Sequence, residues 1–346
     1  MDLKTLELLT SLPGGSGQEL NVRKVMEDKL SKASEILKDG FGGVFGKFEG
    51  TKDDVKVMVC AHMDEVSLMV TKVREDGFLE VMPIGGINVE AFVSQNVLVH
   101  GSKDVRGLIS SIPPHIAKGQ TIPDFSAVVL DIGCDSDEEV KKLGINIGTY
   151  ATPVPSFYLT ENKKYVVNKA MDDRLGCYVV SEIIKKVDKI KHPNTLYLGA
   201  TVQEEVGLRG AQVASNMIKP DLFITVDVSP ASDYLGKKDS GVLGKGFLIR
   251  YYDPRNIMPI KLREYFIELA ENNKIDYQLF KSAGGTDAGA AQYAGNGILA
   301  TTVGIPGRYI HSPATMVSIE DIESAVKFVT KLIENFDKET LDKLHE

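Results

Sequence analysis

Five side chains of metal-binding types lie at the ends of separate apolar stretches of the chain. They are His62, Asp172, Glu205, Asp227 and His311. Imidazole and carboxylate donors together suit Zn²⁺, Co²⁺ or Mn²⁺ rather than Ca²⁺ or a thiolate-bound metal. Five such ligands with one bridging carboxylate would hold two ions about 3.5–4 Å apart, the spacing of two-metal hydrolases. The residue types therefore predict a site for two divalent metal ions.

Two further acids stand beside predicted ligands. Asp64, two residues beyond His62, is placed to accept a hydrogen bond from the imidazole nitrogen that does not face the metal. Glu204, directly beside Glu205, is placed to take a proton from the attacking water as a general base. A lone strand-end histidine is more often structural, and a lone acid pair is more often solvated. The agreement of several segments, rather than any one of them, carries the prediction.

The elements that must position these residues are strands alternating with helices. Continuous apolar runs predict strands at Val55–Cys60, Thr195–Val202, Leu222–Val226 and Ile298–Val303. The residues that follow these strands are, in turn, His62, the Glu204-Glu205 pair, Asp227 and His311. Open α/β sheets bind ligands beyond the carboxyl ends of their strands, so these side chains are expected to meet at one edge of a sheet.

Helical periodicity is expected between and after these strands. It predicts helices at Arg174–Val187, around Ala211–Met217, at Ile260–Asn272 and from Ile319 onward, and two helices near the N-terminus broken at residues 13–17. Asp172 and Asp173 directly precede the first of these predicted helices. Carboxylates there suit the helix dipole and a capping role as well as metal binding, and these roles can hold together.

The pattern of the sequence changes between residues 66 and 159, where short segments rich in β-forming residues alternate with turn-forming residues. This pattern predicts a compact β-barrel or β-sandwich. The fold class is therefore expected to be α/β, with a layered mixed sheet flanked by helices and a small inserted β-barrel. The predicted domains are a discontinuous catalytic α/β domain of residues 1–65 and 160–346, and an inserted barrel of residues 66–159.

Charge and hydropathy exclude several classes of partner. The formal net charge of −8 disfavours nucleic acid and anionic membranes, which reward a basic surface. No apolar run approaches the roughly 20 residues that span a bilayer, and the start of the chain lacks a signal-peptide pattern. A cytoplasmic location is expected. Paired lysines are interpreted as exposed charges rather than a nucleic-acid patch; they are Lys141-Lys142, Lys185-Lys186 and Lys237-Lys238.

Six ordered motifs carry a family resemblance. They are AHMDE (61–65), NKAMDDRLG (168–176), VQEEVGLRGA (202–211), TVDVSP (225–230), GGTDAGAA (284–291) and RYIHSP (308–313). Across roughly residues 10–335 the chain resembles the glutamyl and deblocking aminopeptidases, a family of cytoplasmic dinuclear metallopeptidases. The similarity is strongest to its bacterial glutamyl members.

The resemblance implies a role for each predicted site residue. His62 and Asp227 would bind one metal, Glu205 and His311 the other, and Asp172 would bridge them. Glu204 would be the general base, Asp64 would orient His62, and the Asp172–Asp173 peptide would be cis. The inserted barrel would help to join subunits into dimers that assemble as a hollow tetrahedral dodecamer. The substrates would be peptides with a free N-terminus.

The chain departs from the family in the insert, where Gly85-Gly86-Ile87-Asn88 replaces the frequent Gly-Gly-Trp. This departure is expected to leave the metals untouched and to alter the contacts of the insert. A preference for Glu or Asp at the first position is the favoured specificity. It needs a cation in the pocket, and Arg250 and Arg308 are the candidates by position.

Four alternatives stay open on sequence grounds. The enzyme could have broad specificity, or it could be a deblocking aminopeptidase that accepts blocked N-termini. A carboxylate pair could also serve a glycoside hydrolase of the endoglucanase type, although such an enzyme would not need two histidines and a third acid. A scaffold protein that has lost catalysis would show a broken ligand set, and this set is intact.

Overall fold

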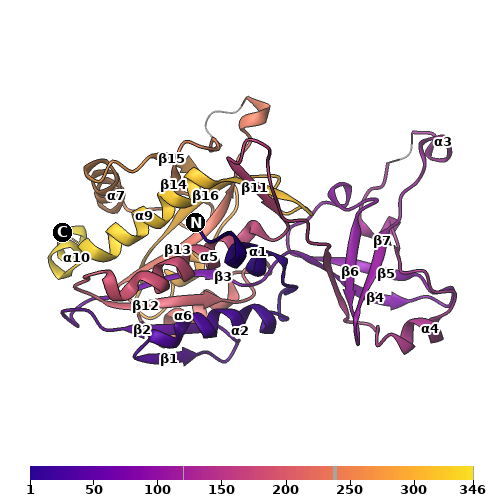
Figure 1. Cartoon of the computed structure of the whole chain (residues 1–346), viewed down its shortest axis with the longest axis horizontal. Coiled ribbons are helices and arrows are strands. Elements are labelled where there is room, and N and C mark those ends of the chain that lie inside the picture. The colour runs from indigo at the N-terminus through magenta and orange to yellow at the C-terminus, as the bar shows by residue number, and fades with distance from the viewer. Residues whose placement is uncertain (120, 237–239, 346) are drawn as a thin grey trace.

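The computed structural model describes residues 1–119, 121–236 and 240–345. Figure 1 shows two parts, a large one in which helices cover a sheet and a smaller β-barrel that stands to one side. The chain passes from the first part into the barrel after β3 (Lys56–His62) and returns to the large sheet at β10 (Tyr158–Leu159). None of the helices in the described residues is long and apolar enough to cross a membrane.

The larger part is built on one 11-stranded mixed sheet. Its main path runs through β1 (Glu35–Lys38), β2 (Val44–Phe48), β12 (Thr195–Thr201), β3 (Lys56–His62), β13 (Leu222–Pro230), β16 (Leu299–Arg308), β17 (Thr315–Ser318), β11 (Tyr165–Asn168) and β10 (Tyr158–Leu159). Two further strands branch from β16, namely β14 (Phe247–Tyr252) and its neighbour β15 (Tyr277–Lys281). Because β12, β3, β13 and β16 are mutually parallel, their carboxyl ends lie at one edge of the sheet.

Helices cover both faces of this sheet because its central strands are apolar on both. In β3, Val57 and Val59 belong to the largest hydrophobic core, whereas Met58 and Cys60 belong to a second core. Successive side chains of a strand point to opposite faces, so the two cores lie on the two sides of the sheet. Helices α5 (Met171–Lys186) and α9 (Ile319–Asn335) contribute to the first core, and α6 (Arg209–Ile218) and α8 (Ala288–Ala291) to the second.

The remaining helices of the larger part are α1 (Leu3–Ser11), α2 (Leu20–Lys29), α7 (Ile260–Asn272) and α10 (Lys338–His345). The predicted helix at 260–272 is confirmed, and the predicted break at 13–17 lies between α1 and α2. The lysine pairs 141–142 and 185–186 are exposed as predicted, and the pair at 237–238 lies outside the described residues.

Six strands close the barrel in the order β4 (Ser67–Val73), β5 (Leu79–Ile84), β8 (Leu130–Asp131), β7 (Asp104–Ile109), β6 (Asn96–His100) and β9 (Tyr150–Pro153). It has its own hydrophobic core, and two short helices, α3 (Pro114–Ala117) and α4 (Asp137–Lys142), lie between its strands. The predicted α/β fold with an inserted β-barrel is confirmed. The domain boundaries at residues 66 and 159 and the roles of the two domains stay predictions.

Candidate metal centre

The predicted ligands converge at the carboxyl edge of the parallel strands. His62 is the last residue of β3, which is longer than predicted, and the Glu204-Glu205 pair lies in the turn after β12. His62 pairs in register with Thr201, the last residue of β12, which brings that turn beside the histidine. The parallel register of the sheet therefore places side chains together that are far apart in sequence.

The other three predicted ligands reach the same edge from different elements. Asp227 lies inside β13 rather than after it, because this strand continues to Pro230 instead of ending at Val226 as predicted. His311 lies in the loop after β16, and Asp172 lies at the start of α5. The peptide between Asp172 and Asp173 is cis, as the resemblance implied.

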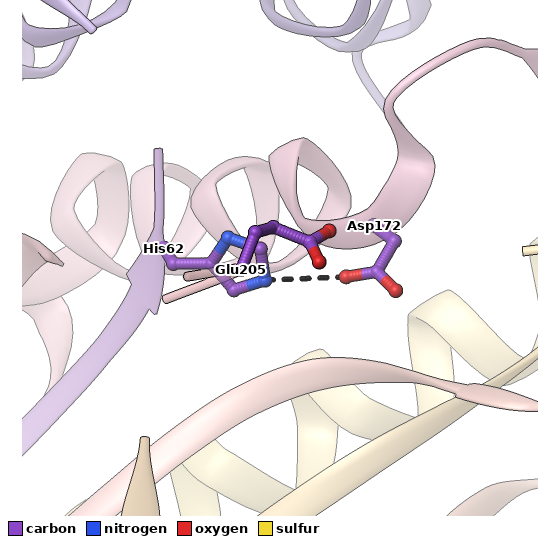
Figure 2. A group of neighbouring side chains, drawn as sticks. All are labelled: His62, Asp172 and Glu205. Carbon is purple, nitrogen blue, oxygen red and sulfur yellow. Dashed lines mark hydrogen bonds and ion pairs between the residues drawn. The ribbon is translucent and has the colours of Figure 1, made fainter. Parts of the chain in front are cut away.

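Asp172 stands between the two histidines. Its Oδ1 lies 3.2 Å from His62 Nε2, and its Oδ2 lies 3.3 Å from His311 Nε2. Glu205 Oε2 is 3.6 Å from the same nitrogen of His311. Figure 2 shows His62, Asp172 and Glu205 turned toward one another, and their ligand atoms lie within 4.8 Å of each other. One carboxylate that faces a histidine with each oxygen has the arrangement of a bridging ligand.

A second group of potential ligands shares His62 with the first. Ligand atoms of His62, Glu204 and Asp227 lie within 4.8 Å of one another, and Glu204 Oε2 is 3.9 Å from His62 Nε2. The side chain of Glu204 is 11% exposed and that of His62 is 1% exposed. The acid predicted to act as base thus lies next to the predicted ligands and still reaches solvent.

The other ring nitrogen of each histidine, Nδ1, also has a hydrogen-bond partner. His62 Nδ1 lies 3.1 Å from the carbonyl oxygen of Asp64 and 3.3 Å from its Oδ1. His311 Nδ1 lies 2.7 Å from the carbonyl oxygen of Gly86. A neutral imidazole that donates from Nδ1 presents a lone pair at Nε2, so both rings are arranged to offer Nε2 to a metal.

Asp64 is completely buried and joins several parts of the site. Its Oδ2 accepts hydrogen bonds from Ser16 Oγ at 2.7 Å and from the backbone nitrogen of Glu205 at 3.2 Å. Its Oδ1 accepts from the backbone nitrogen of Glu204 at 2.9 Å. These bonds and the interaction with His62 outweigh burial and keep the pKa of Asp64 below its usual value. One carboxylate therefore fixes both His62 and the turn that carries the two glutamates.

Burial of several acids together shifts their pKa values upward. Desolvation and the charge of Asp172 raise the pKa of Asp227 to about 7. Burial raises the pKa of Glu205 to about 8 against the opposing effect of His311. The pKa of Glu204 is raised well above its usual value by burial and by the like charges of Asp227 and Glu205. Such a cluster of acids is unfavourable unless positive charge is brought among them.

The donor set fits divalent cations. Glu205 Oε1 is buried and has no hydrogen-bond partner among the described residues. Burying an oxygen of a charged group without a partner is costly, and a cation would satisfy it. Two histidines and three carboxylates, one of which would be shared, also match the ligands preferred by Zn²⁺, Co²⁺ and Mn²⁺.

The site opens into a small cavity of about 120 Å³, which we call the catalytic cavity. Its lining includes Asp172, Glu204, Asp227, His311, Arg250, Pro230 and Ser282. Arg250 is buried, its Nη2 donates to Ser229 Oγ at 2.7 Å, and its Nε has no partner among the described residues. Arg308 does not line this cavity, and it donates two hydrogen bonds to Asp233, each of 2.7 Å.

Some neighbours of the site were not found from the sequence. Ser16 lies in the predicted helix break, and Gly86 lies in the segment expected to leave the metals untouched, yet its carbonyl contacts His311. Asp287 of the GGTDAGAA motif directly precedes α8, where an aspartate could cap the helix, but its side chain makes no capping bond, is buried and accepts a hydrogen bond from Thr201 Oγ1. His192 looks like a surface residue from its sequence, and this expectation is wrong, because the residue is buried and its Nδ1 lies 2.8 Å from the carbonyl oxygen of Asn194.

Comparison with known proteins agrees with this geometry. The sequence profile of the M42 glutamyl aminopeptidase family matches residues 42–328. The chain is 35% identical over 342 residues to a glutamyl aminopeptidase of Lactococcus lactis subsp. cremoris, with 96% of each protein covered. It is 34% identical over 345 residues to a lysyl aminopeptidase of Pyrococcus furiosus, covering 96% of this chain and 97% of that protein.

Two solved structures extend the comparison. A TET aminopeptidase from a marine sediment archaeon of the Thaumarchaeota superposes with a TM-score of 0.95, at 33% identity and with 99% of each chain covered. The Pyrococcus horikoshii TET1 peptidase, which can assemble into a tetrahedron or a large octahedral shell, gives 0.87 at 28% identity, with 96% of this chain and 99% of that chain covered. With a family profile over most of its length and relatives above 30% identity, the chain belongs to the M42 glutamyl aminopeptidase family and is a hydrolase of peptide bonds.

Proposed function

We propose that this protein is a dinuclear metal-dependent aminopeptidase that prefers Glu or Asp at the free N-terminus of peptides. The observation that carries the proposal is the position of Asp172, whose two oxygens face two different histidines. In this proposal His62 and Asp227 hold one ion, Glu205 and His311 hold the other, and Asp172 bridges them. Bound Zn²⁺, Co²⁺ or Mn²⁺ would polarise the scissile carbonyl and make water a better nucleophile at neutral pH.

Glu204 is the proposed general base. Its carboxylate takes a proton from the attacking water and passes it to the departing amine, a role that suits an acid with a raised pKa in a partly enclosed site. Asp64 is the proposed positioning residue for His62 and for the glutamate turn. The surrounding acids also offer negative charge to the α-ammonium group of the substrate, which supports cleavage of the terminal bond.

Arg250 is the proposed reader of an acidic first side chain. A carboxylate that enters a cavity of this size needs a cation, and Arg250 lines the wall with an unpartnered Nε among the described residues. Arg308 is a weaker candidate because it does not line the cavity and Asp233 holds it with two bonds of 2.7 Å, whereas the ion pair of Arg250 with Asp253 is longer, at 3.4 Å. The lysyl specificity named for one relative makes this preference a question for experiment rather than for family membership.

We also propose that the subunits form homo-oligomers, as dimers that assemble into a tetrahedral dodecamer through the inserted barrel. The support is the shell-forming TET1 peptidase, which shares the fold. Gel filtration with light scattering would measure the assembly. If a chain without the barrel still assembled with the same number of subunits, that result would count against the role of the barrel.

The test of the activity is amino-acid release from a panel of unblocked peptides whose first residue is Glu, Asp, Leu or Lys, with N-acetylated copies as controls. The assay is run as purified, after chelation, and after Zn²⁺, Co²⁺ or Mn²⁺ is restored. The proposal expects metal-dependent release from free N-termini, fastest for Glu and Asp. Turnover of acetylated copies would favour the deblocking alternative, and activity on β-glucans that survives chelation would favour a glycoside hydrolase.

A further inference from the structure

A second, much larger hollow lies beside the catalytic cavity, and we call it the cationic groove. Its volume is about 990 Å³, and it is lined by Pro230, Ser232, Ser240, Tyr251, Tyr252, Pro254, Arg263, Leu279, Phe280, Lys281, Ser282 and Ala283. Pro230 and Ser282 line the catalytic cavity as well. The two hollows therefore share a wall, and the groove gives room for a part of the substrate that the small cavity cannot hold.

The charge of the groove is opposite to that of the catalytic cavity. Its lining holds two cations, Lys281 and Arg263, and no carboxylate, whereas the catalytic cavity is lined by three acids. Lys281 is exposed and its Nζ lies 5.6 Å from the centre of the Tyr252 ring. Within residues 1–119, 121–236 and 240–345 neither cation makes an ion pair of 4.0 Å or less. Lys281 is thus an exposed cation and Arg263 a half-buried one, and neither has an acidic partner among these residues of a chain whose net charge is −8.

Regular elements hold the two cations beside the site. Arg263 lies on α7, and Lys281 ends β15, where it pairs in register with Tyr252 of β14. The backbone nitrogen of Ser282 then donates to the carbonyl of Tyr252 at 2.9 Å. Two residues later the carbonyl of Gly284 accepts from Arg250 Nη1 at 3.3 Å. A short, hydrogen-bonded stretch of chain therefore connects the cationic groove to the wall of the catalytic cavity.

We propose that the cationic groove binds a carboxylate of the peptide on the leaving-group side of the scissile bond. This inference rests on the proposed aminopeptidase function. An enzyme that removes one residue keeps only that residue on one side of its catalytic centre, and the rest of the peptide extends away. A short peptide carries its own C-terminal carboxylate in that remainder, and an acidic side chain there offers the same chemistry. Lys and Arg side chains recognise both.

The experiment compares matched substrates on the metal-loaded, full-length enzyme. The first pair is Glu-Ala-Ala with a free C-terminus and with a C-terminal amide. The second pair is Glu-Ala-Glu-amide and Glu-Ala-Gln-amide. The variants are Lys281→Gln, Arg263→Gln and the double variant, and Lys274→Gln is the control because Lys274 is exposed between α7 and β15 and lies outside the groove. Cleavage of Glu-p-nitroanilide, which carries no peptide on the leaving-group side, measures the basal aminopeptidase activity of the wild type.

The expected result is a wild-type preference for the carboxylate member of at least one pair. In the double variant that ratio of kcat/KM should fall by between about twofold and thirtyfold, through KM, since the variant removes two ion pairs and each pair near the surface contributes only modestly. The first pair identifies the C-terminus as the bound group, and the second identifies an acidic side chain. Lys274→Gln should leave both ratios unchanged.

Two results would overturn the inference while leaving the proposed function standing. In one, the wild type cleaves Glu-p-nitroanilide, but the ratio of kcat/KM within each substrate pair is the same in every variant as in the wild type. In the other, the double variant changes the ratio of Glu-p-nitroanilide to Leu-p-nitroanilide instead, which would assign the groove to the first side chain. A wild-type enzyme that cleaves neither the anilide nor any peptide with any metal would refute the proposed function itself.

Discussion

The adjacent acids Glu204 and Glu205 are assigned different tasks, and replacing each by glutamine separates them. Glu204 lies 3.9 Å from His62 and is the proposed base, whereas Glu205 lies 3.6 Å from His311 and is a proposed ligand. Glutamine keeps the size and one oxygen of either side chain but loses the basic carboxylate. Loss of a general base costs on the order of 10²–10⁴ in rate, or about 3–5.5 kcal/mol in the barrier.

Glu204→Gln is therefore expected to lower kcat for Glu-p-nitroanilide by that factor while the bound metal stays near the wild-type level. Its thermal stability should not fall, because the substitution removes one of several like charges that burial crowds together. Glu205→Gln is expected to lose bound metal first, and its activity should recover in part when metal is added in excess. Steady-state kinetics, elemental analysis and thermal unfolding on the same samples make the comparison.

The assignment would be refuted by a Glu204→Gln enzyme that keeps more than about a tenth of kcat, because loss of a general base lowers the rate by much more than tenfold. It would also fail if Glu204→Gln lost metal while Glu205→Gln kept it. Exchanged phenotypes of that kind would show that the turn after β12 offers Glu204, not Glu205, to the metal. The cluster of His62, Glu204 and Asp227 makes this outcome a real alternative to measure.

Three further predictions follow from the same contacts. Asp64→Asn should lower activity or metal affinity on the order of 10–100-fold, measured by kinetics and metal titration, because it weakens the hold on His62; unchanged values would remove its positioning role. Arg250→Gln should reduce the Glu-to-Leu preference in kcat/KM while Arg308→Gln does not, and equal effects would argue against Arg250. Burial raises the pKa of Asp321 from 3.8 to about 7, so the folded state keeps a proton that the unfolded chain releases between these values. The contribution of this group to the free energy of unfolding is therefore present below about pH 4 and is lost as the pH rises toward 7. Urea unfolding of the wild type and of Asp321→Asn at several pH values measures this contribution. The free energy of unfolding of the wild type minus that of the variant should fall as the pH rises, and a difference that grows with pH would contradict the reasoning.

The sheet and the five predicted ligands could be inferred because each depends on short-range patterns. Apolar runs followed by His62, Glu204-Glu205 and His311 identify strand ends, and the parallel order brings such ends together. The points at which strands end are harder to predict from the sequence. Asp227 lies inside β13 because the strand pairs with β16 as far as Pro230, and this pairing is set by a partner distant in sequence.

Contacts that depend on the tertiary arrangement could not be predicted. Ser16 and Asp64 are 48 residues apart and carry no shared local pattern, and the bond between them exists only once the helix break folds under the glutamate turn. The burial of His192 likewise follows from packing rather than from its polar surroundings in sequence. The cationic groove belongs to the same class, since Arg263 and Lys281 reach it from a helix and a strand.

The carbonyl of Gly86 has a consequence for the autonomy of the larger part of the molecule. This oxygen comes from the segment after β5 of the barrel, and it lies 2.7 Å from His311 Nδ1. Beside it, a side-chain carbon at Gly85 would come within 3.3 Å of Glu205 Oε2 and 2.9 Å of Val66 Cγ1, so little room is left at that position. A minimal enzyme made by exchanging the barrel for a short linker would lose the group that orients this histidine. The insert thus supports the catalytic cavity from outside its wall, through His311. Engineering can vary the far side of the barrel only while Gly85 and Gly86 keep their positions beside the predicted metal ligands.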